Sequence, residues 1–134
     1  MEKFFWADQI AERIIQEKGD KSTYVCASGI TPSGKVHIGN FREVITTDLV
    51  VRALKDKGKK VKFIYSWDDF DRFRKVPVGI SGEYEKYIGM PVSEVPSPFP
   101  GEKGSYAQHF EKELEESIKN VGVAPEFIYQ NSMN

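Results

Sequence analysis

Residues 29–40, Gly29-Ile30-Thr31-Pro32-Ser33-Gly34-Lys35-Val36-His37-Ile38-Gly39-Asn40, decide the fold of this chain, because they form a small-residue turn between two patterned segments. The apolar run over 23–27 predicts a short buried strand before the turn. Apolar residues recur at helical spacing after it, which predicts a helix over 37–57. A strand, a glycine-rich turn and a helix start together favour phosphate binding, since the first helical N–H groups lack intrahelical partners.

The rest of the chain continues this alternation of strands and helices. Apolar spacing predicts helices over 7–18 and 105–121 and strands over 61–67 and 126–130. Residues 76–104 hold most of the prolines and predict an irregular insertion with a short helical piece near 83–87. Because strand–helix–strand crossovers make parallel pairs, we expect an α/β fold that forms one mononucleotide-binding half of a doubly wound sheet.

Composition narrows the class of protein. The 134 residues suffice for one domain, and 19 Lys and Arg against 20 Asp and Glu give no overall basic field for nucleic acids. One cysteine excludes an internal disulfide. Since we expect neither a signal peptide nor a membrane-spanning run, we predict a soluble cytoplasmic protein with no membrane partner.

The turn carries side chains that suit a nucleotide. Thr31 and Ser33 supply hydroxyl groups, and Gly39 lets a base lie close to the backbone. His37 and Asn40 are three residues apart at the helix start, so they share a face and can reach the same oxygen atoms. The pattern is neither that of a P-loop nor the dinucleotide-binding glycine pattern.

An acidic cluster follows the second predicted strand at Asp68, Asp69 and Asp71. Parallel strands end at the same edge of a sheet, so these carboxylates should lie at the same rim as the turn. Two roles stay open for them. They can receive an ammonium group of a ligand, or they can pair with the basic residues of 72–75 and order the loop.

Residues 31–40 resemble the HIGH motif of class I aminoacyl-tRNA synthetases, with Asn40 in the last position. Residues 28–34, 40–43, 67–77 (WDDFDRFRKVP) and 89–96 further resemble the class I, archaeal-type lysyl-tRNA synthetases. The resemblance covers nearly all of the chain but only the N-terminal part of that family. It implies that residues 1–134 form the first half of a Rossmann-like catalytic domain, three-layered with a parallel sheet and interrupted by the insertion at about 76–104.

The resemblance also implies a reaction and its residues. In the parent enzyme, lysine would be activated with ATP, accompanied by Mg²⁺, and then transferred to tRNA(Lys). This chain carries the half with the HIGH motif, and its expected part is the binding of ATP and lysine. His37 and Asn40 would be catalytic, as donors to the phosphates. The implied ATP-binding residues are Ser33, His37, Gly39 and Asn40, and the implied lysine-binding residues are Gly29, Thr31 and Asp69.

Two departures from the family matter. Residues 97–104 lack the cysteine/histidine cluster that holds zinc in some members, so we predict no metal site there and place His109 on the surface of its helix. The second half-sheet and the KMSKS loop are missing, so we expect a fragment whose truncated face favours self-association. Two alternatives are another HxGH-type nucleotidyltransferase and a non-catalytic fragment that only binds a nucleotide.

Overall fold

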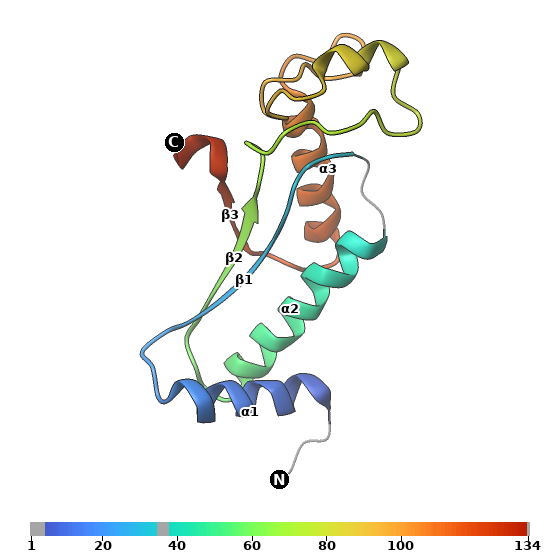
Figure 1. Cartoon of the computed structure of the whole chain (residues 1–134). Coiled ribbons are helices and arrows are strands. Elements are labelled where there is room, and N and C mark those ends of the chain that lie inside the picture. The colour runs from blue at the N-terminus through green and yellow to red at the C-terminus, as the bar shows by residue number, and fades with distance from the viewer. Residues whose placement is uncertain (1–4, 35–37, 134) are drawn as a thin grey trace.

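The computed structural model describes residues 5–34 and 38–133, and it has the predicted α/β architecture (Figure 1). In chain order the elements are α1 (Trp6–Lys18), β1 (Tyr24–Ile30), α2 (Ile38–Asp56), β2 (Val61–Trp67), η1 (Gly82–Tyr87), α3 (Tyr106–Asn120), β3 (Glu126–Tyr129) and η2 (Gln130–Met133). None of the helices in this described part of the chain combines the length and apolar character needed to cross a membrane.

Local sequence signals explain where several elements begin and end. Gly19 ends α1 with a φ of 77°, and its N–H donates to the carbonyl of Ile15. A capping box begins α3: the Ser105 hydroxyl accepts from the Gln108 N–H at 3.1 Å, and the Gln108 side chain accepts from the Ser105 N–H at 3.0 Å. The strand predicted over 23–27 extends further, to Ile30, because its pairing with β2 continues that far.

The three strands form one parallel sheet in the order β1-β2-β3, which confirms the predicted pairing. The register of β1 and β2 runs from Tyr24 opposite Val61 to Ile30 opposite Trp67. Both strands therefore end at the same edge, and the Asp68 N–H donates to the Ile30 carbonyl at 3.0 Å. This edge brings the residues after β1 and β2 together.

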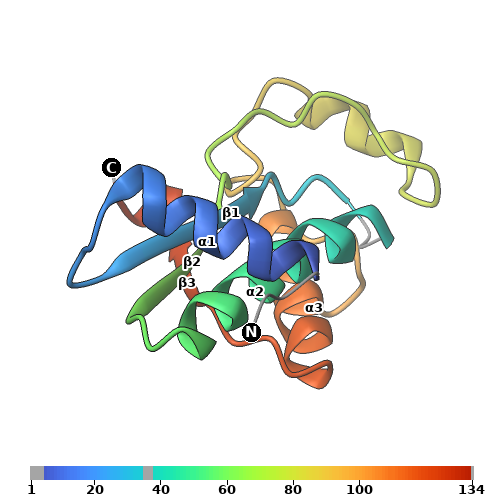
Figure 2. The ribbon, with the colours of Figure 1, turned by 90° about the horizontal axis from the view of Figure 1, so that it is seen from below.

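Helices α2 and α3 lie on the same side of the sheet (Figure 2). The buried side chains between these layers are Val44, Val51, Phe63, Tyr65, Trp67, Leu114, Ile118 and Val123. On the opposite face Val25 is 60% exposed, and Ala27 and Ser66 are also exposed. The described chain thus supplies the sheet and one helical layer of the implied three-layer arrangement.

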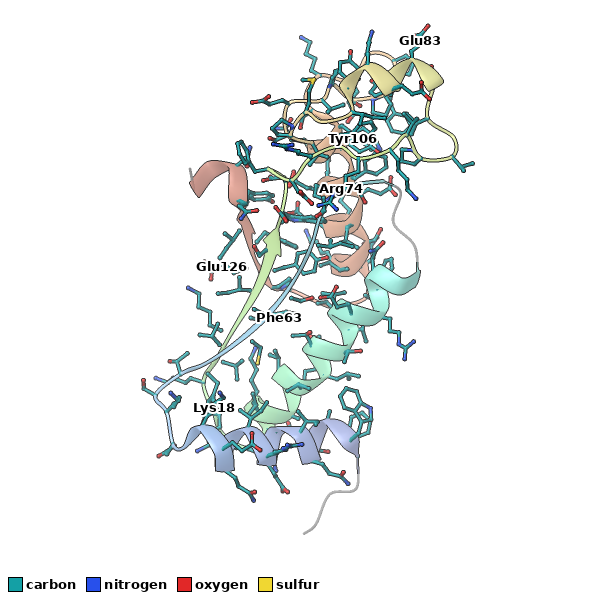
Figure 3. The ribbon with its side chains drawn as sticks, in the orientation of Figure 1. Lys18, Phe63, Arg74, Glu83, Tyr106 and Glu126 are labelled. Carbon is teal, nitrogen blue, oxygen red and sulfur yellow. The ribbon has the colours of Figure 1, made fainter. Side chains whose placement is uncertain are left out.

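The insertion (residues 76–104) lies beyond the carboxyl edge of the sheet, and it shares a small core with Phe73 and the first residues of α3 (Figures 1 and 3). The buried residues of this core are Phe73, Val92, Val95, Tyr106, Ala107 and Phe110. The Phe73 N–H donates to the Met90 carbonyl and the Gly89 N–H to the Phe73 carbonyl, both at 2.8 Å. The predicted short helical piece is η1, and the largely irregular backbone around it is nevertheless packed.

Candidate functional site

The turn after β1 leads directly to the start of α2. Within it the Ser33 N–H donates to the Thr31 carbonyl at 2.8 Å, which bends the chain sharply. Helix α2 begins at Ile38, and its first N–H groups lack intrahelical partners. His37, one of the two predicted catalytic residues, lies outside the described residues.

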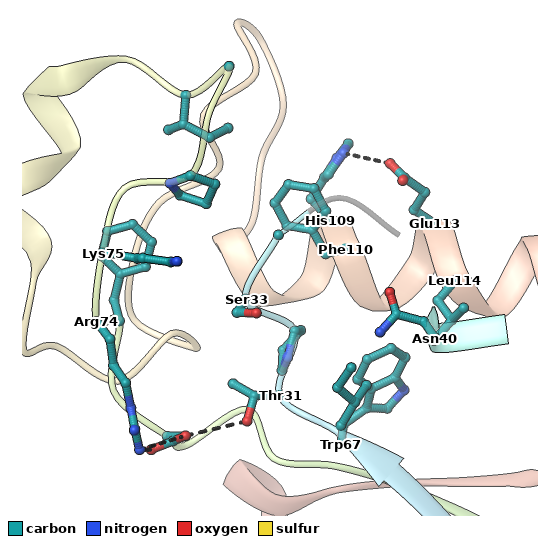
Figure 4. A pocket seen from close by; sticks show the side chains of 18 of the residues that line it. Thr31, Ser33, Asn40, Trp67, Arg74, Lys75, His109, Phe110, Glu113 and Leu114 are labelled. Carbon is teal, nitrogen blue, oxygen red and sulfur yellow. Dashed lines mark hydrogen bonds and ion pairs between the residues drawn. The ribbon is translucent and has the colours of Figure 1, made fainter. Parts of the chain in front are cut away.

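An open cavity of about 1210 Å³ lies beside this turn, and we call it the turn cavity (Figure 4). Its walls come from four parts of the chain: the turn at 30–34 with Asn40, the end of β2, the segment 71–80, and one face of α3 with Phe99. The site therefore lies at the carboxyl edge of a parallel sheet, which is where open α/β sheets bind their ligands.

The structure brings three of the predicted ligand-binding residues to this cavity. Thr31, Ser33 and Asn40 line it, from the turn and from the first turn of α2 (Figure 4). Asn40 is 9% exposed, so its surroundings cover most of this residue. The two glycine candidates, Gly29 and Gly39, are not among the residues that line the cavity. Gly39 is exposed and precedes Asn40, and Gly29 lies in β1 and precedes Ile30, the first lining residue.

Gly29 is required by packing as well as by its place near the turn. It pairs with Ser66 of β2, and a Cβ atom at this position would lie 2.4 Å from the backbone oxygen of Ser66. Backbone atoms cannot give way as a flexible side chain can. A residue larger than glycine would therefore displace the end of β1, from which the turn starts.

Asp71 is the member of the acidic cluster that lines the turn cavity. The Thr31 hydroxyl donates to it at 3.4 Å, and the Arg74 guanidinium lies at 3.4 Å (Figure 4). The N–H of Arg72 and the positive charge of Arg74 hold the pKa of Asp71 below its usual range. Asp71 is therefore an ionised carboxylate next to Thr31, suited to receive a cation.

Asp69 lies elsewhere, in a buried acidic cluster with Glu111 and Glu115. It is 2% exposed, is absent from the lining of the turn cavity, and accepts from the Asn131 N–H at 2.8 Å. Burial, then the hydrogen bond with Asp69, raises the pKa of Glu111 to about 9. The role of Asp69 in lysine binding stays a prediction, while its contacts tie the loop after β2 to η2.

His109 is not the surface residue that the sequence suggested. Its imidazole is half-buried, lines the turn cavity and stacks on Phe99 with ring centroids 4.1 Å apart. Nδ1 lies 2.9 Å from Glu102, and Nε2 lies 3.5 Å from Glu113 (Figure 4). No local motif indicates this contact, because it depends on how the insertion folds back onto α3.

Metal binding by the protein itself has little support from the side chains. Across residues 5–34 and 38–133, no group of three or more His, Cys, Asp or Glu side chains is placed to hold a metal ion.

Comparison with known proteins agrees with this architecture. The sequence model of a family described as "tRNA synthetases class I (K)" matches residues 4–134. The chain is 56% identical over 128 residues to a lysine–tRNA ligase of Treponema pallidum, with 94% of this chain and 24% of the relative covered. It is 52% identical over 128 residues to the lysine–tRNA ligase of Pyrococcus horikoshii, with 96% and 24% covered. A lysine–tRNA ligase of Borrelia garinii is 53% identical over 133 residues, with 98% and 25% covered. The chain thus spans about a quarter of the length of these curated relatives.

Proposed function

The chain belongs to the family of class I lysyl-tRNA synthetases, and from that membership we propose that the turn cavity binds ATP and lysine. The protein would join them as lysyl-adenylate and then transfer the lysyl group to tRNA(Lys). The observation that carries this proposal is the convergence of Thr31, Ser33 and Asn40 on one cavity beside the start of α2.

The proposed ATP contacts follow from the chemistry of these groups. The Ser33 hydroxyl and the Asn40 amide can donate to phosphate oxygens, and the positive end of the α2 dipole favours an anion nearby. His37 belongs to the same set through its place in the HIGH-type motif. Gly39 is exposed and has no side chain, so an adenine ring can lie against its backbone.

The proposed lysine contacts are on the β1 side of the turn. Gly29 and Thr31 would line this pocket, and the ammonium group needs a carboxylate within reach. Asp71 has the better geometry for that role, because it lines the cavity next to Thr31 whereas Asp69 is buried against Asn131.

The proposed reaction is an in-line displacement. A carboxylate oxygen of lysine attacks the α-phosphorus of ATP, a new P–O bond forms, and the bond to pyrophosphate breaks with its electron pair leaving on pyrophosphate. The residues of the turn hold the reactants in line and donate to the oxygens on which charge develops. Mg²⁺ would accompany ATP and offset phosphate charge.

ATP–pyrophosphate exchange with each of the twenty amino acids in turn tests the proposal. We expect exchange with lysine, and a fall of about 100-fold on Asn40→Ala, the usual order for losing one aimed donor. Asn120→Ala, at the exposed end of α3, is the matched control and should leave the rate unchanged. Exchange with a different amino acid, or equal rates for both variants, would contradict the proposal.

Two further parts of the proposal concern the protein's surroundings. We propose a cytoplasmic location and self-association through the open face of the sheet around Val25. Sedimentation of the protein over a range of concentrations tests the association. A constant monomer mass would exclude it.

A further inference from the structure

Tyr106, the first residue of α3, links the core of the insertion to the turn. Its side chain is fully buried, and its ring packs edge-on against Phe73 at 5.2 Å and close to Phe110 at 4.8 Å between centroids. Its hydroxyl donates to the Ser33 carbonyl at 2.6 Å, across 73 residues of sequence. Figure 3 shows Tyr106 where the insertion meets α3.

The bond acts on the peptide that leads into the HIGH-type motif. The carbonyl and the N–H of a trans peptide point in opposite directions, so holding the Ser33 carbonyl also fixes the direction of the Gly34 N–H. Gly34 packs against the same wall: a Cβ there would lie 3.4 Å from Pro77 and 3.7 Å from the Tyr106 hydroxyl. The Ser33 N–H is already directed to Thr31.

We propose that Tyr106 is a positioning residue, whose hydroxyl holds the Ser33–Gly34 peptide so that the turn presents its donors to the phosphates. The insertion, through the core that it shares with α3, thereby supports the ATP-binding turn. The phosphate part of this inference rests on the proposed function; the link between Tyr106 and Ser33 is a property of the chain itself. Tyr106 touches no substrate in this account and acts through Ser33 and Gly34.

The buried phenol of Tyr106 stays protonated. Burial raises the pKa of Tyr106 to about 12, so the phenol keeps its proton and remains a donor at neutral pH. The phenol therefore holds the turn without acting as a pH switch.

Tyr106→Phe removes this hydroxyl and keeps the ring that fills the insertion core. Ser33 is exposed, so water can reach the freed carbonyl, and we expect the variant to fold. The matched control is Tyr84→Phe, because the Tyr84 hydroxyl donates to carbonyls within the insertion, those of Pro96 and Ser97 at 3.1 and 2.8 Å, and not to the turn. Both variants lose a tyrosine-to-carbonyl bond, and only one of these bonds reaches the turn.

Two readouts separate positioning from stability. Calorimetric titration with ATP should show about fivefold weaker binding for Tyr106→Phe and wild-type affinity for Tyr84→Phe, as expected for the loss of one hydrogen bond. Amide NMR signals of Ser33 and Gly34 should shift in Tyr106→Phe alone. Melting temperatures of both variants, measured alongside, show how much stability each has lost.

Each outcome decides the inference. Unmoved Ser33 and Gly34 signals in Tyr106→Phe, or equal weakening of ATP binding in both variants, would overturn it. If the wild-type protein bound no ATP while these signals shifted in Tyr106→Phe alone, the proposed function would fail and the link between Tyr106 and the turn would stand.

Discussion

Replacing Glu111 with glutamine should make the protein more stable at alkaline pH. Glu111 lies on α3 and is 3% exposed, and its Oε2 atom has no hydrogen-bond partner among the described residues. The titratable groups around it are Asp69 after β2, Glu115 on the same helix and Tyr129 of β3. Burial first, and then the hydrogen bond and the charge of Asp69 with the charge of Glu115, disfavour an ionised carboxylate here and raise the pKa of Glu111 to about 9.

The sign and size of the effect follow from this shift. The carboxyl titrates near 4.5 in the unfolded chain and near 9 in the folded protein, so the folded state binds the extra proton between these values. The protonated carboxyl therefore makes its full contribution to the free energy of unfolding below pH 4.5. This contribution decreases as the pH rises towards 9. The slope is about 1.4 kcal/mol per pH unit, or on the order of 4 kcal/mol between pH 5 and pH 8.

Urea unfolding at pH 5, 6, 7 and 8, followed by the fluorescence of buried Trp67, measures this slope. Glu111→Gln keeps the size of the side chain and a donor towards Asp69 but cannot titrate, so its free energy of unfolding should vary much less with pH. Glu116→Gln, an exposed position on the same helix, should keep the wild-type slope. A wild-type stability that stays constant from pH 5 to pH 8, or parallel curves for wild type and Glu111→Gln, would refute the reasoning.

Three other predictions concern the turn and the metal content. Gly29→Ala should destabilise the protein by about 1–3 kcal/mol, because the added Cβ would meet the Ser66 backbone oxygen. Thermal melting checks this. Gly82→Ala is the control and should leave the melting temperature unchanged, because a Cβ at Gly82 would meet no atom within 4 Å. Asp71→Asn should raise the lysine concentration needed for half-maximal exchange about tenfold while sparing the ATP requirement; if Asp69→Asn alone raised it, the ammonium would belong to Asp69. Elemental analysis of the purified protein should find no stoichiometric zinc, and one zinc per chain would contradict the absence of a metal site in the insertion.

Features that depend on neighbouring residues were predictable from the sequence. The β-branched and aromatic run of β2 predicts its strand with the observed bounds, and Ser105 with Gln108 predicts the start of α3. The parallel arrangement follows from the strand–helix–strand order, and this order places Asp71 of the acidic cluster beside the turn.

Features that depend on contacts across the chain were not predictable. Asp69 and Asp71 differ by only two positions, yet one is buried beside Glu111 of α3 and the other lines the turn cavity. That difference is set by packing against residues about 40 positions away in the sequence. The local spacing of apolar and polar residues does not predict such distant contacts. The bond of Tyr106 to Ser33 of the turn and the stacking of His109 on Phe99 of the insertion also depend on how separate parts of the chain pack together.

A crystal structure of the protein with a non-hydrolysable lysyl-adenylate analogue tests the central claim most directly. We expect the adenosine beside Gly39 and Asn40, the phosphate mimic beside Ser33, and the lysyl group between Gly29, Thr31 and Asp71. An analogue bound away from the turn cavity, or one that fails to bind at millimolar concentration, would contradict it.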